Sequence, residues 1–116
     1  MPKLPETIQI GAQEFTIAQR SKKEDGMLND GAYGYTLETE NLIVIDADIH
    51  LSKKKVTVIH EIMHAIRLIN DSPIKPKKED EFEDVEHYFI SMWEANLIQV
   101  LRDNPKLKNW IFEDAK

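Results

Sequence analysis

The residues most able to do chemistry are the five from His60 to His64, which read His-Glu-Ile-Met-His. Histidines four positions apart lie on one face of a helix, so both imidazoles can bind one metal ion, at about 2.0–2.1 Å each for zinc. Glu61 occupies the neighbouring position, where it can accept a proton from an activated water and pass it to a leaving amine. The pattern predicts a zinc ion (Zn2+) on His60 and His64, with Glu61 as general base.

The same pattern also has a purely structural interpretation, in which the two histidines bind backbone or carboxylate partners within a core. Apolar residues flank them in the sequence, namely Val58, Ile59, Ile62 and Met63. Two unpaired imidazoles among apolar side chains would be costly. This surrounding favours the metal over the structural interpretation.

A catalytic zinc usually has three protein ligands and an open position for water. A third histidine six residues beyond His64 would complete one common arrangement, but Asn70 occupies that position and Arg67 stands where that arrangement has a glycine. The chain also has no cysteine, so thiolate ligands are excluded. The third ligand must therefore be another carboxylate or histidine, or an external group.

Candidates for this ligand lie in the second predicted helix. Glu86 follows Phe82 by one turn and shares a face with Phe89 and Trp93, so we expect it to point into the core, where a carboxylate needs a cationic partner. A bond from a backbone amide or a lysine is the alternative role for Glu86. Glu83 is the second choice for the ligand. The remaining alternatives are Glu94, Asp71 and an external ligand.

The segment that precedes the motif is predicted to form strands and turns. Apolar residues alternate from Thr7 to Arg20 around Gly11, which is typical of a β-hairpin. Residues 21–34 are polar and contain glycine, so we expect an irregular connection. Two further strands are predicted at Tyr35–Glu38 and Leu42–Asp46. Together these segments predict a small antiparallel-type sheet of three or four strands.

Two helices are predicted to follow the sheet. Ser52 is a plausible N-cap for an amphipathic helix from Lys53 to Ile69, which carries the histidine motif at its centre. The second helix is predicted from about Glu79 to Asp103, where Asn104-Pro105 ends it. Residues 106–116 are expected to form a short helical turn packed on the body. The fold class is therefore α+β, in one domain that spans residues 1–116.

Composition limits the classes of partner. The 116 residues carry a net charge of −6, with a pI near 5.2, which excludes a general nucleic-acid binder because phosphate neutralisation needs a basic face. No apolar run approaches the roughly 20 residues of a membrane span, so no membrane partner is expected. The N-terminal residues lack an apolar signal core, and we expect a cytoplasmic protein.

The motif helix, the short linker and a second helix with Val85-Glu86 that ends at Asn104-Pro105 resemble the very small gluzincin-like metallopeptidases of phages and mobile elements. They are more distantly similar to the metal-binding domain of the ImmA/IrrE type of regulatory peptidase. The likeness extends from residue 57 to residue 105. It implies a minimal zincin-like fold, with a small sheet over the active-site helix. It also implies a ligand set of His60, His64 and Glu86, with Glu61 catalytic.

The first functional hypothesis is a zinc-dependent peptidase acting on a peptide or protein substrate. The alternative is a non-catalytic regulatory or protein-binding module in which zinc stabilises the fold. A metal-free helical interaction domain is a third hypothesis, but it leaves the histidine pair unexplained.

Two secondary features of the site are open at this stage. A substrate could add as a strand to a sheet edge, for which Leu42–Asp46 is the candidate, although this segment could equally be a paired central strand. A donor near the developing oxyanion is also needed. The side chains of a suitable type are Tyr33, Tyr35, His87 and Tyr88.

Overall fold

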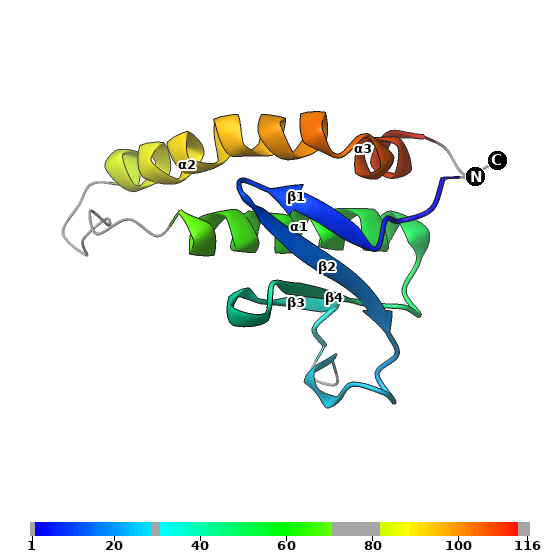
Figure 1. Ribbon diagram of the computed structural model, residues 1–116. Helices are drawn as coiled ribbons and strands as arrows, with labels where there is room; N and C mark the ends of the chain where they lie inside the picture. The colour runs from blue at the N-terminus through cyan, green and yellow to red at the C-terminus, as the bar shows by residue number, and fades with distance from the viewer. Residues whose placement is uncertain (1, 29–30, 71–81, 114–116) are drawn as a thin grey trace.

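The computed structural model describes residues 2–28, 31–70 and 82–113, except for the side chains of 82–84. These residues form an α+β fold (Figure 1). In chain order, the elements are β1 (Thr7–Ile10), β2 (Gln13–Arg20), a 3-10 turn η1 (Gly26–Leu28), β3 (Gly34–Leu37), a second turn η2 (Glu38–Glu40), β4 (Leu42–Asp46), α1 (Leu51–Ile69), α2 (Phe82–Asp103) and α3 (Pro105–Phe112).

The four strands form one sheet in the order β1-β2-β4-β3. The predicted hairpin is confirmed: β1 and β2 are antiparallel, and the turn between them uses a positive φ of 60° at Gly11. β3 and β4 are also antiparallel, but β4 runs parallel to β2, with Thr16 opposite Leu42. The predicted antiparallel-type sheet is therefore wrong in this respect, because the sheet is mixed.

The position of β4 explains the mixed sheet. The chain leaves the end of β2, forms β3 on the outside and returns as β4 into the space between them. Four of the five residues of β4 are buried, which suits a strand covered on both faces. Leu42–Asp46 is thus the paired central strand, and its interpretation as an edge strand is wrong. The two edges of the sheet are β1 and β3.

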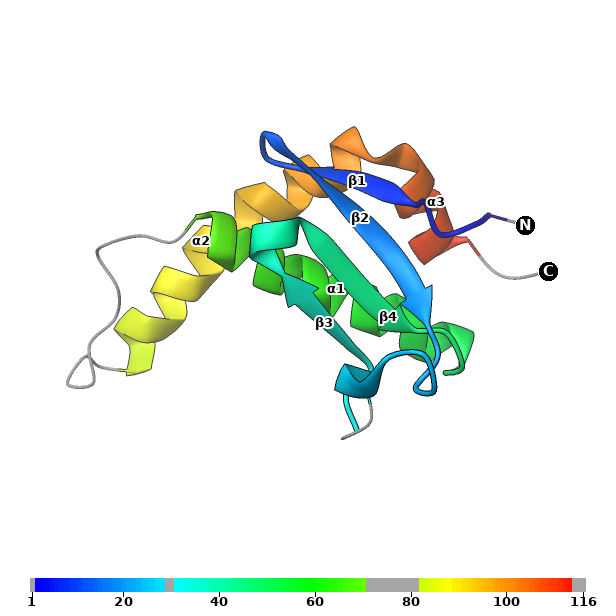
Figure 2. The ribbon, with the colours of Figure 1, turned by 60° about the horizontal axis from the view of Figure 1, so that its bottom comes forward.

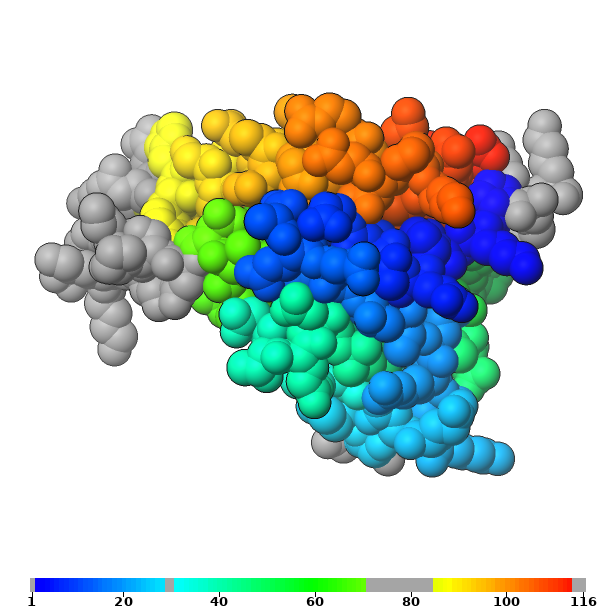
Figure 3. Space-filling model, viewed as in Figure 1, coloured from blue at the N-terminus to red at the C-terminus, as the bar shows by residue number. Residues whose placement is uncertain are grey.

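The main core lies between the sheet and the helices. In Figures 1 and 2, α1 runs behind the sheet, and α2 and α3 lie along its β1 side. The space-filling view shows α2 and α3 directly against the β1–β2 hairpin (Figure 3). The buried residues of this core are Ile8, Ile10, Phe15, Ile17, Ile43, Ile45, Val58, Ile62, Ala65, Ile66, Val100, Leu107 and Trp110.

The predicted helices are largely confirmed, with one correction at the start of α1. Ser52 is not the N-cap, because the helix begins at Leu51 and His50 holds the cap position in an extended conformation. Leu51 packs against the core, which favours the longer helix. The second helix is confirmed over 82–103, whereas its predicted first residues, 79–81, lie outside the described residues. The predicted final helical turn is α3.

Side chains from the end of α2 close the β1 edge of the sheet. The Asn104 amide accepts a hydrogen bond from the Gln9 N–H (2.7 Å) and donates one to the Gln9 carbonyl (2.8 Å), as a neighbouring strand would. Gln99 accepts a bond from the N–H of Gly11 at 2.8 Å. An unpaired strand edge invites association with another chain, and these two amides remove that opportunity at β1.

No helix in the described part of the chain combines the length and the apolar character that crossing a membrane would require.

Replacing Asn104 tests the closed edge. We expect Asn104→Ala to lower the free energy of unfolding by about 1–3 kcal/mol, because the partly buried backbone groups of Gln9 lose their partners. Urea unfolding measures the change. Asn109→Ala, at an exposed position of α3, is the matched control and should change stability little. Equal effects of the two substitutions would contradict the role of Asn104.

Candidate metal centre

His60 and His64 lie one turn apart on the exposed side of α1, with their ring nitrogens facing each other. The two Nε2 atoms are 3.1 Å apart, and the ring planes meet at 73°. Two nitrogen ligands of one tetrahedral zinc ion, each at about 2.0–2.1 Å, are separated by about 3.3 Å. Two unshared electron pairs so close together repel unless a proton or a cation lies between them. The separation is close to that of two ligands of one cation, and it also fits a hydrogen bond between the two rings.

The surroundings of the two imidazoles differ from the sequence-based expectation. Their apolar neighbours Val58 and Ile62 are fully buried, whereas both histidines are exposed. The cost of burying unpaired imidazoles thus does not apply. The argument for a cation comes instead from the facing nitrogens.

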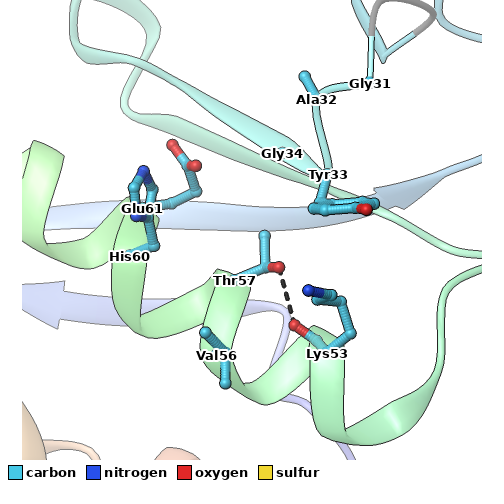
Figure 4. A pocket seen from close by; sticks show the side chains of 9 residues that line it. All are labelled: Gly31, Ala32, Tyr33, Gly34, Lys53, Val56, Thr57, His60 and Glu61. Atoms are coloured by element: carbon cyan, nitrogen blue, oxygen red, sulfur yellow. Dashed lines mark hydrogen bonds between the residues drawn. The ribbon is translucent and has the colours of Figure 1, made fainter.

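Glu61 is buried beside the exposed pair and is held by a neighbouring strand. Its side chain is 5% exposed, and the hydroxyl of Thr36 on β3 lies 2.8 Å from its Oε1 and 3.1 Å from its carbonyl oxygen. A buried carboxylate needs such a donor. Figure 4 shows the carboxylate beside the His60 ring, on the side of α1 that faces β3. One oxygen is therefore anchored, while the side chain still lines the site.

The group of metal-ligating side chains in the described part of the chain consists of His60, Glu61 and His64, whose ligand atoms lie within 4.8 Å of one another. Glu86 is not a member of this group, and its side chain is exposed. The expectation that Glu86 points into the core is therefore wrong. Its role as the third ligand stays a prediction.

Trp93, on the same stripe of α2 as Glu86, contacts α1. Its indole Nε1–H donates to the carbonyl of Met63 on α1 at 3.1 Å, and its ring stacks on Phe89 at 5.3 Å. These aromatic side chains fill the contact between the helices. Of the other candidate ligands, Glu94 is exposed on α2 and is not a member of the group, whereas the side chains of Glu83 and Asp71 lie outside the described residues.

Two pockets flank Glu61 along the line where β3 faces α1. Their volumes are about 350 and 280 Å³. The larger one is lined by Gly31, Ala32, Tyr33, Gly34, Lys53, Val56, Thr57, His60 and Glu61. The smaller one is lined by Gly34, Tyr35, Thr36, His60, Glu61, His64 and Leu68. Because Gly34, His60 and Glu61 line both, the two pockets are adjacent on either side of the histidine motif, and together they are called the groove.

Gly34 allows the close approach that creates the groove. A Cβ at this position would lie 2.7 Å from the carbonyl oxygen of Val44 and 3.0 Å from Cγ2 of Thr57. Sequence reasoning missed both Gly34 and Thr36. A glycine in a strand is a sign of close backbone approach and could have drawn attention to Gly34. No sequence signal identifies Thr36, because its partner lies 25 residues further along the chain.

The four side chains proposed as oxyanion donors differ in their hydrogen bonds and in their distance from the pockets. The Tyr35 hydroxyl donates to Asp25, which also binds Arg20 at 3.1 Å, so this hydroxyl proton is already committed. Tyr33 is 43% exposed and lines the larger pocket. The candidates on α2 are a half-buried Tyr88 and an exposed His87.

The bonds of Asp25 attach the segment after β2 to the sheet and change two pKa values. The hydroxyl of Tyr35 holds the pKa of Asp25 below its ordinary value, and the N–H of Met27 and the Arg20 guanidinium act in the same direction. Burial raises the pKa of Tyr35, and its bond with Asp25 raises it further. At neutral pH the pair is therefore a neutral phenol and a carboxylate.

Comparison of the chain with models of protein families, with curated proteins and with solved structures found no match. A functional assignment for this protein therefore depends on the chemistry of the groove. The described geometry provides two facing imidazoles, an anchored carboxylate and a groove that extends to both sides of them.

The bond of Asp25 predicts a pH-dependent stability. Because its pKa is lowered on folding, the stabilisation is complete above the pKa of the unfolded chain, about 3.9, and is lost as the pH falls through the lower folded value. We expect Asp25→Asn to be less stable than the wild type at pH 7, and the gap to narrow below about pH 4. Urea unfolding across this range measures the gap. Asp48→Asn, at an exposed site, is the control; a gap independent of pH would contradict this assignment.

Proposed function

We propose that this protein is a zinc-dependent peptidase with a zincin-like arrangement, in which His60 and His64 bind the metal and Glu61 is the general base. The observation that carries the proposal is the pair of Nε2 atoms 3.1 Å apart beside a buried carboxylate that Thr36 anchors. This group lies at the middle of a groove, as hydrolysis within a peptide chain requires.

The donor set suits zinc. Imidazole nitrogens with carboxylate or water oxygens are ordinary zinc ligands, and the separation of the two rings matches one shared ion. Zinc, when bound, acts as a Lewis acid and lowers the pKa of water to about 7. Glu61 takes the proton of the attacking water on the oxygen that Thr36 leaves open, and delivers it to the leaving amine. The hydroxyl of Thr36 keeps this carboxylate in place throughout.

The edge of β3, beside which the described residues place no further strand, supports a peptide as the substrate. The N–H of Asp46 donates to the carbonyl of Tyr33, so the odd-numbered residues of β3 form the backbone hydrogen bonds with β4. Backbone groups of successive strand residues point to opposite sides, so those of Gly34 and Thr36 point away from β4. A peptide can pair with these groups as an added strand directly over the groove. The opposite edge, β1, is closed by side-chain amides.

The alternative, a site that stabilises the fold, receives less support. The described metal-ligating side chains all belong to α1, so without a third ligand from α2 a shared cation joins only consecutive turns of one helix. A stabilising metal usually gains its effect by joining segments that are far apart in the chain. The exposed rings and the flanking pockets favour a site that admits a substrate.

Replacing the general base separates catalysis from metal binding. We expect Glu61→Gln to lower kcat/KM for peptide hydrolysis by at least about 100-fold, because the amide cannot accept the proton. The amide oxygen can still accept the bond from Thr36, so zinc content and melting temperature should change little. Peptide cleavage, metal analysis and thermal unfolding measure the three quantities.

Glu14→Gln, at an exposed position of β2, is the matched control and should retain full activity. If the zinc-loaded wild type cleaves nothing across a diverse peptide library, the peptidase proposal fails and the regulatory or protein-binding module takes its place.

Metal titration identifies the ligands. We expect His64→Ala to weaken zinc binding by more than about 100-fold, beyond the usual cost of losing an outer-shell partner, whereas His50→Ala should bind zinc normally. Glu86→Gln and Glu83→Gln, titrated in parallel, show which of the two predicted glutamates supplies the third ligand. Unchanged zinc affinity in both would assign that position to Glu61, water or another group. Normal affinity in His64→Ala would refute the metal site.

A further inference from the structure

The larger pocket contains a positively charged side chain that the proposed chemistry of Glu61 and the two histidines does not require. Among the described residues, Lys53 is the only lysine or arginine that lines either pocket. Its Nζ lies 4.9 Å from the centre of the Tyr33 ring, within the range of a cation–π contact. Figure 4 shows the ammonium turned toward Thr57, beneath the Tyr33 ring. The pocket thus contains a positioned positive charge.

Neighbouring lysines on α1 are engaged differently. Lys54 donates to the side chain of Gln19 at 3.0 Å, and Lys55 donates to the carbonyl of Glu113 at 3.0 Å. Lys53 has neither a hydrogen-bond acceptor nor a carboxylate partner among the described residues. The chain has a net charge of −6, yet this lysine faces a pocket without a carboxylate as its ion-pair partner.

The pocket is continuous with the proposed reaction site. Lys53, Thr57 and Glu61 follow each other at intervals of four residues and line the same side of α1. Eight residues of helix span about 12 Å, while an extended peptide advances by about 3.3 Å per residue. The side chain of a bound peptide about three or four residues from the cleaved bond can therefore enter the pocket and meet the ammonium of Lys53.

We propose that this pocket is a specificity subsite for acidic side chains, with Lys53 as the cation that pairs with a substrate aspartate or glutamate and Tyr33 as the ring that positions Lys53. The inference rests on the proposed peptidase function, whose site it extends. The pocket volume of about 350 Å³ is at the lower end of the range of small-ligand sites, about 300–1,000 Å³, and exceeds what one side chain needs. Among the described lining residues, Glu61 is the one carboxylate, and it lies two helical turns from Lys53, so the ammonium is the partner for an acidic side chain at the far end of the pocket.

Matched peptides that differ only by glutamate or glutamine near the cleaved bond test this subsite. With the zinc-loaded wild type, we expect kcat/KM to be about three- to fivefold higher for the glutamate peptide, the range of a partly exposed ion pair, and the preference to shrink at high salt. Lys53→Gln should remove the preference, and Lys53→Glu should reverse it. Lys54→Gln, which removes the same charge outside the pocket, should retain it.

A binding measurement keeps the inference separate from catalysis. Fluorescence anisotropy of the same two peptides with zinc-loaded Glu61→Gln should show tighter binding of the glutamate peptide, and the double variant with Lys53→Gln should bind both equally. If the wild type cleaves both peptides at the same rate, or if Glu61→Gln binds both equally, the subsite is overturned while the peptidase proposal stands. If no peptide is cleaved but the binding preference depends on Lys53, the subsite stands and the peptidase proposal fails.

Discussion

The hydrogen bond between Thr36 and Glu61 is the interaction on which the arrangement of the site depends. It joins the edge strand β3 to the middle of α1, two elements that the chain separates by β4 and a turn. A carboxylate in this position would be costly without a donor, and the strand supplies one. Gly34 of the same strand also lies close to its neighbours, since a Cβ there would be 2.7 Å from the carbonyl oxygen of Val44 on β4 and 3.0 Å from Cγ2 of Thr57 on α1.

The two edges of the sheet, β1 and β3, differ in what pairs with their backbone groups. At β1, side-chain amides of Asn104 and Gln99 take the place of a neighbouring strand, so this edge cannot pair with another chain. At β3, the outward backbone groups lie over the groove that holds the histidine motif. In the described part of the chain, side-chain amides therefore cover β1, and no further strand pairs with β3.

Charge is also distributed unevenly around the site. Glu61 is buried and anchored, the two imidazoles are exposed, and Lys53 contributes a cation at the far end of the larger pocket. Next to β3, the Asp25 carboxylate binds Arg20 and the hydroxyl of Tyr35. These bonds attach the segment after β2 to the sheet. The hydroxyl of Tyr35 is thereby committed to the structure of the strand.

Local patterns in the sequence determined the elements and the centre of the site. Periodicity predicted the hairpin, the strand Leu42–Asp46 and both long helices, and the spacing of His60 and His64 alone placed their rings on one helical face. Tertiary structure decided what depends on contacts between distant residues: the insertion of β4 beside β2, the bond from Thr36 to Glu61, and the exposure of Glu86. Periodicity along one helix shows which residues share a stripe, but packing against other elements decides which of them are buried: Trp93 bonds to α1, whereas Glu86 on the same stripe is exposed.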